Sequence, residues 1–154
     1  MIVKIKKLSD KAVTPKYAMP GDAAMDLVAA KVEYDKKRHC FVYYSDLAFE
    51  VPDNHVMLLF PRSSNARTNA YLTNSVGIID SSYRGNVMAC YKIKGNDPDD
   101  SFSEDIIIKS AAPYQEGERF AQIMILPYPQ ITFEETDKLS DTLRGEGGYG
   151  STGK

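Results

Sequence analysis

The sequence predicts a single all-β domain, either a sandwich or a barrel, and three observations lead to this prediction. The apolar segments are short, several alternate with polar residues, and most are bounded by turn-forming residues. Eight prolines are spread along the chain, and they leave room for a long helix only where the residue pattern does not favour one. The length of 154 residues is that of one domain. There is no internal repeat.

The expected strands follow from these segments in chain order. Residues 41–44 are aromatic and β-branched, and residues 47–51 alternate between large apolar side chains and Ala48 or Glu50. Residues 106–108 are three consecutive isoleucines, and residues 123–126 form another apolar run that ends before a proline. Runs of this composition between turn formers are typical of strands.

One short helix is expected over residues 63–71, with Ser63 or Ser64 as its N-cap. Residues 95–105 are acidic and faintly resemble a calcium-binding loop. Phe102, however, stands where such a loop needs a glycine for its sharp turn, so we expect a solvated excursion.

Composition excludes several classes of protein. Hydrophobic residues make up 43% and charged residues 26%, which is typical of a folded globular protein. The formal net charge of −2 argues against nonspecific nucleic-acid binding. The apolar run 56–60 is far shorter than the roughly 20 residues of a membrane span. The alternating N-terminal residues do not resemble a signal peptide.

Cysteine usage adds a prediction about location. Cys40 and Cys90 form no CxxC pair, and neither they nor the two histidines have the spacing of a zinc site. We therefore expect a reducing cytoplasm, which would be that of the host cell for a viral protein.

Residues 145–153 contain five of the ten glycines and cannot form a stable strand or helix. Such a stretch is either a floppy end or a loop whose backbone N–H groups wrap an anion, and Arg144, Ser151 and Thr152 favour the anion. The glycine spacing also matches a dinucleotide-binding fingerprint, but that motif requires a helix after it. We predict a β-rich core over residues 1–143 and a flexible glycine-rich lid over residues 144–154.

Five short segments combine charge, small residues and glycine. They span residues 21–27, 61–64, 74–85, 117–122 and 144–153. Their arginines, Arg62, Arg119 and Arg144, have the planar guanidinium that suits a polyphosphate. Asp26 and Asp80 offer a metal–water contact and a general base, and Tyr83 and Tyr149 offer flat faces for a sugar or a base. Each of these residues also has an ordinary structural explanation when it is taken alone.

Taken together and in this order, the five segments resemble the five motifs of the homotrimeric dUTPase family. The resemblance runs from Gly21 to Gly153, and the third and fifth segments are its most specific parts. It implies a jelly-roll-like (β-clip) subunit with at most one short helix, assembled as a homotrimer with three shared active sites. It also implies hydrolysis of dUTP to dUMP and pyrophosphate with Mg²⁺, which keeps uracil out of DNA and supplies dUMP for thymidylate synthesis.

The resemblance further implies a role for each matching residue. Asp80 matches the aspartate that activates the attacking water, and Asp26 matches one that acts through a Mg²⁺-bound water or a neighbouring arginine; no direct protein ligand to the metal is expected. Tyr83 matches the tyrosine under the deoxyribose, and Tyr149 the aromatic that stacks on uracil. The expected substrate-binding residues are Arg62, Ser63, Ser64, Asn74, Gly77, Ile79, Tyr83, Gln122, Arg144, Tyr149, Gly150, Ser151 and Thr152.

The chain departs from the family pattern in places, and two other functions stay open. Ala24, Met25 and Ser64 replace residues that are usual in the family, and residues 91–116 are longer than in compact members. A dCTP deaminase would need a glutamate near the third segment, and residues 74–87 contain none. A regulatory protein could keep the fold without turnover, although every catalytic position is filled. The sequence does not reveal a protein partner.

Overall fold

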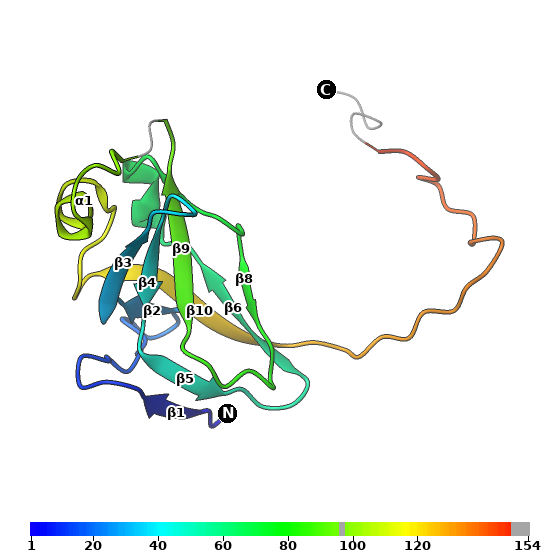
Figure 1. Cartoon of the computed structure of the whole chain (residues 1–154). Helices are drawn as coiled ribbons and strands as arrows, with labels where there is room; N and C mark the ends of the chain where they lie inside the picture. Colours follow the sequence, from blue (N-terminus) through cyan, green and yellow to red (C-terminus); the bar gives the residue numbers. More distant parts are fainter. Residues whose placement is uncertain (96–97, 149–154) are drawn as a thin grey trace.

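The computed structural model describes residues 1–95 and 98–148, and within them ten strands form three antiparallel sheets (Figure 1). One α-helix and one 3₁₀ helix complete the described elements. The strands are β1 (Lys4–Lys7), β2 (Met25–Val28), β3 (Lys31–Asp35), β4 (Cys40–Tyr44), β5 (Leu47–Glu50), β6 (His55–Phe60), β7 (Ala70–Leu72), β8 (Gly77–Ile79), β9 (Met88–Ile93) and β10 (Arg119–Pro127). The expected strands at residues 41–44, 47–51 and 123–126 are confirmed, and so is the all-β class.

Two four-stranded sheets enclose the core. One has the order β2-β10-β6-β8 and the other β3-β4-β9-β7, while β1 and β5 pair as a separate ribbon. Their inward side chains form a single apolar cluster, in which Leu27, Tyr43, Leu59, Tyr91 and Phe120 are at most 1% exposed. Burial of large apolar side chains of this kind is the main stabilising contribution to such a domain.

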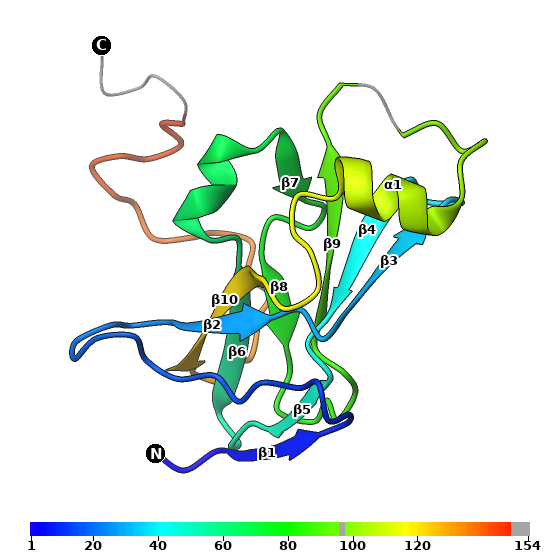
Figure 2. The same cartoon turned by 90° about the vertical axis from the view of Figure 1, so that its left-hand side faces the viewer.

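The three isoleucines of residues 106–108 do not form a strand, and that prediction was wrong. They lie in helix α1 (Glu104–Ala111), which packs beside β3 (Figure 2). Only Ile107 is fully buried, whereas Ile106 is 51% exposed, so the isoleucine run is divided between the faces of a helix. Glu104 Oε1 accepts a hydrogen bond of 3.0 Å from the Tyr34 N–H, so α1 also covers part of the edge strand β3.

The other predicted helix exists but differs from the prediction. Residues Ser63–Arg67 form the 3₁₀ helix η1, which is shorter than the expected residues 63–71. Its N-cap is Arg62 rather than Ser63 or Ser64, and no side-chain hydrogen bond caps it. A guanidinium has no acceptor for a backbone N–H, and that of Arg62 donates to Asp26.

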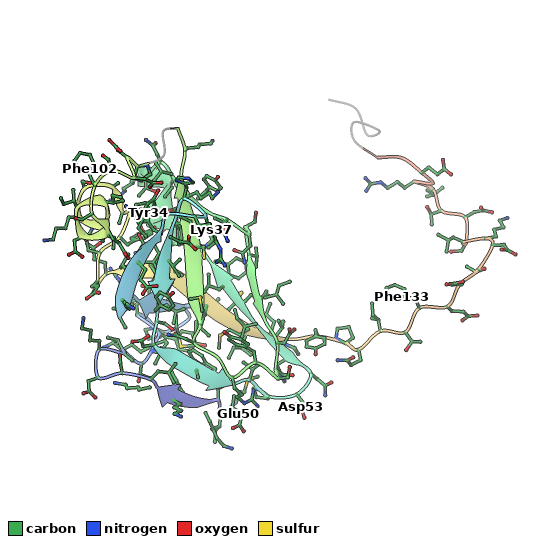
Figure 3. All side chains as sticks on the ribbon, in the orientation of Figure 1. Tyr34, Lys37, Glu50, Asp53, Phe102 and Phe133 are labelled. Atoms are coloured by element: carbon green, nitrogen blue, oxygen red, sulfur yellow. The ribbon has the colours of Figure 1, made fainter. Side chains whose placement is uncertain are left out.

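The chain leaves the sheets after β10. Residues 128–148 contain no helix or strand and run away from the body of the molecule as an extended arm (Figure 1). Phe133 is 88% exposed on this arm and projects into solvent (Figure 3). In the described part of the chain, no helix is both long and apolar enough to cross a membrane.

Candidate functional site

A pocket of about 190 Å³ lies beside strand β8, and we call it the β8 pocket. It is lined by Asn74, Gly77, Ile78, Ile79, Asp80, Tyr83, Asn86, Val87 and Met88. The pocket therefore brings together five of the residues predicted for the site: Asn74, Gly77, Ile79, Asp80 and Tyr83. The pocket mixes an apolar wall with backbone amides and a carboxylate, a lining that suits a flat, polar-edged molecule.

The local structure explains why these residues meet. Ser75 has a φ of +61° and makes the sharp turn between β7 and β8. Gly77 pairs with Leu59, and a Cβ at position 77 would lie 3.1 Å from the Leu59 Cβ, so the close approach of β8 to β6 favours glycine. Asp80 then follows the end of β8, and the Tyr83 N–H donates to the Asp80 carbonyl at 3.1 Å in a turn.

A second hollow, of about 450 Å³, lies at the other end of the same sheet, and we call it the arginine pocket. Its lining includes Asp26, Arg62, Ser63, Arg119 and Gln122, together with Lys16 and Asp22. Arg62 Nε donates to Asp26 Oδ1 at 2.6 Å, and Arg119 Nη1 donates to Asp26 Oδ2 at 3.1 Å. The three cations outnumber the two carboxylates, and guanidinium groups in this number suit an anion with several oxygens.

A β-bulge in β10 positions two of these side chains. The pairing of β10 with β2 shifts between Arg119 and Ala121, which adds one residue to β10. In a regular strand, residues 119 and 122 would point to opposite faces. The bulge lets both Arg119 and Gln122 line the arginine pocket, while Phe120 and Ala121 are both buried.

Ser63 and Ser64 face different hollows. Ser63 lines the arginine pocket, whereas Ser64 lines a neighbouring hollow together with Tyr114, and its Oγ accepts from Arg62 Nη1 at 3.1 Å. Burial raises the pKa of the Tyr114 phenol, against smaller lowering effects of Ser64 and Arg62. Tyr114 therefore stays neutral and contributes a hydrogen-bonding group, not a charge, to this side of η1.

Asp80 and Arg62 lie at opposite ends of β6 within one chain. Ile79 pairs with Met57 near one end of β6, whereas Gln122 pairs with Phe60 at the other end. Met57 precedes Arg62 by five residues, which corresponds to about 17 Å of extended chain. The structure thus groups Asp26, Arg62, Ser63 and Gln122 in one place and Asp80 and Tyr83 in another.

The remaining predicted residues lie on the C-terminal arm. Arg144 Nε donates to the Gly147 carbonyl at 2.9 Å, and the side chain lines neither pocket. Gly145 has a φ of +52°, a conformation that glycine adopts readily. Tyr149, Gly150, Ser151 and Thr152 lie outside the described residues.

Within residues 1–95 and 98–148, no three His, Cys, Asp or Glu side chains come together as a group that could ligate a metal ion. Asp26 is the carboxylate nearest the arginines, and both of its oxygens already accept from them. This donor set suits an ion held chiefly by ligand phosphates and waters, which is how Mg²⁺ is commonly bound.

Sequence reasoning missed five residues that line the two pockets, and two of them, Lys16 and Asn86, are polar. Lys16 lines the arginine pocket from the loop between β1 and β2, where the sequence shows no motif that could have identified it. Asn86 lines the β8 pocket directly after the third charged segment. Its neighbour Gly85 ends that segment, and this position in the sequence was the only indication that Asn86 lines the pocket.

Comparison with known proteins gives one consistent answer. A model of the dUTPase family matches residues 10–98. The chain is 32% identical over 154 residues to the deoxyuridine 5'-triphosphate nucleotidohydrolase of Crocosphaera subtropica, and the match covers 99% of each chain. It is 35% identical over 153 residues to the enzyme of the same name from Corynebacterium glutamicum, covering 99% of this chain and 95% of that one.

A solved structure agrees with these relatives. The dUTPase of Staphylococcus bacteriophage 80alpha, determined with dUpNHpp, superposes with a TM-score of 0.78 at 25% identity. The superposition covers 99% of both chains.

Proposed function

The chain belongs to the dUTPase family and is a dUTP diphosphatase, and from this premise we propose how its two pockets divide the reaction. The β8 pocket takes the deoxyuridine and supplies the base, and the arginine pocket takes the phosphates. The observation that carries the proposal is the separation of a pocket holding Asp80 and Tyr83 from a cationic pocket holding Arg62 and Arg119.

In the β8 pocket, we assign the uracil edge to Asn74 and to the backbone from Gly77 to Ile79. Tyr83 then lies under the deoxyribose. Asp80 accepts a proton from a water molecule that attacks the α-phosphorus in line with the leaving group. The bond between the α-phosphorus and its bridging oxygen breaks, so the products are dUMP and pyrophosphate. This reaction lowers the dUTP available for DNA synthesis and supplies dUMP.

In the arginine pocket, Arg62, Ser63 and Gln122 hold the phosphate oxygens, with Ser64 supporting Arg62. Asp26 orients Arg62 and Arg119 and would hold a Mg²⁺ ion only through water. When bound, Mg²⁺ would neutralise negative charge on the phosphate oxygens. The protein residues keep the guanidinium groups in place before the substrate arrives, so little reorganisation is needed during the reaction.

We propose that different subunits of a homotrimer bring the two pockets to one nucleotide, because Asp80 and Arg62 of one chain lie at opposite ends of β6. About 17 Å of extended chain separates the level of Ile79 from Arg62 along β6. Apposition of the β8 pocket of one subunit with the arginine pocket of another removes this separation. Closed cyclic assembly gives each subunit the same pair of contacts and so yields three equal sites.

We assign the third part of the site to the C-terminal residues. In this proposal, residues 1–143 are the core with its extended connection, and residues 144–154 close over bound nucleotide. Arg144, Ser151 and Thr152 add phosphate donors, Gly150 permits a close backbone approach, and Tyr149 stacks on uracil. Removal of residues 145–154 is expected to leave a folded protein with very low turnover, because this stretch is too rich in glycine to add much core.

The assay that tests the function supplies dUTP or dCTP with Mg²⁺ and measures pyrophosphate and ammonia. Pyrophosphate from dUTP is expected, with no ammonia from dCTP. Ammonia from dCTP would identify a deaminase instead. Release of neither product, despite binding of dUTP, would identify a regulatory protein that has kept only the fold.

A further inference from the structure

Tyr83 is folded back onto Gly85. A Cβ atom added at Gly85 would lie 2.3 Å from the Tyr83 Oη, 2.5 Å from its Cζ and 2.9 Å from its Cε2. Gly85 is not among the glycines with a positive φ, so its backbone does not require glycine. Glycine is needed at this position for space alone, because any side chain there would displace the Tyr83 ring.

The same hydroxyl end of the ring is also held by Asn86. The Tyr83 hydroxyl donates to the Asn86 carbonyl at 3.0 Å. The Asn86 side chain donates from Nδ2 to Asp46 Oδ1 at 2.7 Å, so the turn between β4 and β5 anchors this residue. The anchor is firm, because the neighbouring Ser45 is fully buried and donates to the Val87 carbonyl at 2.6 Å.

We propose that Gly85 and Asp46 are positioning residues that set the discrimination between deoxyribose and ribose through Tyr83. The inference rests on the proposed function, in which Tyr83 lies under the sugar. A ring can exclude a 2′-hydroxyl only if its place is fixed, since a shift of about 1 Å opens the space that the hydroxyl needs. Gly85 leaves the space in which the Tyr83 ring lies. Asp46 holds Asn86, whose carbonyl accepts from the Tyr83 hydroxyl.

The first test is Gly85→Ala. The measured quantity is the kcat/KM for dUTP divided by the kcat/KM for UTP, on one preparation, so the fraction of folded protein cancels. The ratio is expected to fall by about tenfold or more. In a Tyr83→Ala background the same substitution is expected to leave the ratio unchanged, because the ring that it displaces is gone. An unchanged ratio in the first case, or an equal fall in both, would overturn the proposal.

The second test changes Asp46, which does not line the β8 pocket and contacts it only through Asn86. Asp46 has a φ of +51°, which both glycine and asparagine tolerate. Asp46→Gly removes the acceptor for Asn86 and is expected to lower the same ratio. Asp46→Asn keeps an oxygen acceptor and is expected to retain it. If the glycine variant keeps the ratio, or if both variants lower it equally, Asp46 does not act through Asn86.

These tests separate this inference from the proposed function. If the unsubstituted protein hydrolyses neither nucleotide, or shows no preference for dUTP, the proposed function fails and this inference fails with it. If the protein prefers dUTP, and Gly85→Ala and Asp46→Gly both keep that preference, only the positioning roles of Gly85 and Asp46 are wrong.

Discussion

Asp80 is an exposed carboxylate that directly follows β8 in the β8 pocket. Exposure keeps it available to a water molecule, and the turn closed by the Tyr83 N–H fixes its backbone. Replacement by asparagine keeps the shape of the side chain but removes its ability to take a proton. We expect Asp80→Asn to lower kcat by about 10² to 10⁴-fold, with little change in the Kd of a non-hydrolysable dUTP analogue.

The matched control for this prediction is Asp53→Asn, an exposed aspartate in the turn between β5 and β6. It lines neither the β8 pocket nor the arginine pocket, so kcat is expected to stay the same. A near-normal rate for Asp80→Asn in the same assay would show that another group takes the proton.

At the scale of elements, α1 shows how packing decides the structure of an ambiguous segment. Ile107 is 2% exposed against the core, whereas Ile106 is 51% exposed. We expect Ile107→Ala to reduce the free energy of unfolding by about 2 to 4 kcal/mol, because it removes buried methyl groups and leaves a cavity. Ile106→Ala is expected to change it by about 0.5 kcal/mol or less.

Urea unfolding monitored by circular dichroism measures both variants. Equal losses of stability at the two positions would mean that α1 does not present a single apolar face to the core. The two isoleucines are adjacent and chemically identical, so they have the same intrinsic preference for helix. A difference between the variants therefore reports burial.

At the scale of the whole molecule, the shared site predicts complementation between inactive subunits. Asp80→Asn damages the β8 pocket, and Arg62→Ala damages the arginine pocket. If each site combines pockets from two chains, mixed trimers regain some sites with both pockets intact. An equal mixture, unfolded and refolded together, is expected to recover roughly one quarter of the sites, since each pocket is intact in half of the subunits.

The control is each variant refolded alone, which should stay inactive. Light scattering on the unsubstituted protein is expected to give the mass of three chains. Recovery of no activity in a verified mixed trimer would mean that both pockets of a site come from one chain.

The buried tyrosines make the stability of the molecule depend on alkaline pH. Burial raises the pKa of Tyr43 and of Tyr91 above the usual value of 10.0. Above pH 10 the unfolded chain loses these protons while the folded chain keeps them, so the free energy of unfolding falls as pH rises. Below pH 10 both states are protonated, and these groups contribute no pH dependence.

Urea unfolding at a series of pH values measures this effect. Tyr91→Phe cannot ionise and is expected to reduce the fall above pH 10. Tyr17→Phe is the control, because Tyr17 is 55% exposed, and it should keep the slope of the unsubstituted protein. If the free energy of unfolding falls equally steeply with pH in all three proteins, Tyr91 does not cause the fall.

The sequence by itself determined the β class, several strands and the residues whose side chains suit phosphate binding or catalysis. Residues 41–44 and 123–126 form the expected strands because β-branched and aromatic side chains suit a pleated surface. Residues 106–108 are also β-branched, but they form a helix that packs against β3. Ser103 before Glu104 and Asp105, with Lys109 in the last turn, was the helix signal that the isoleucine run obscured.

Only the tertiary structure decided where the site residues lie. Arg62 and Asp80 are 18 positions apart in the sequence, which gives no indication of their distance in space. The register of β6 against β8 and β10 places them at opposite ends of one strand. The position of Tyr83 likewise depends on Gly85 next to it and on Asp46, 37 positions away in the sequence. Pairing between distant strands and the exclusion of overlapping atoms set these positions, and neither is a property of a local segment.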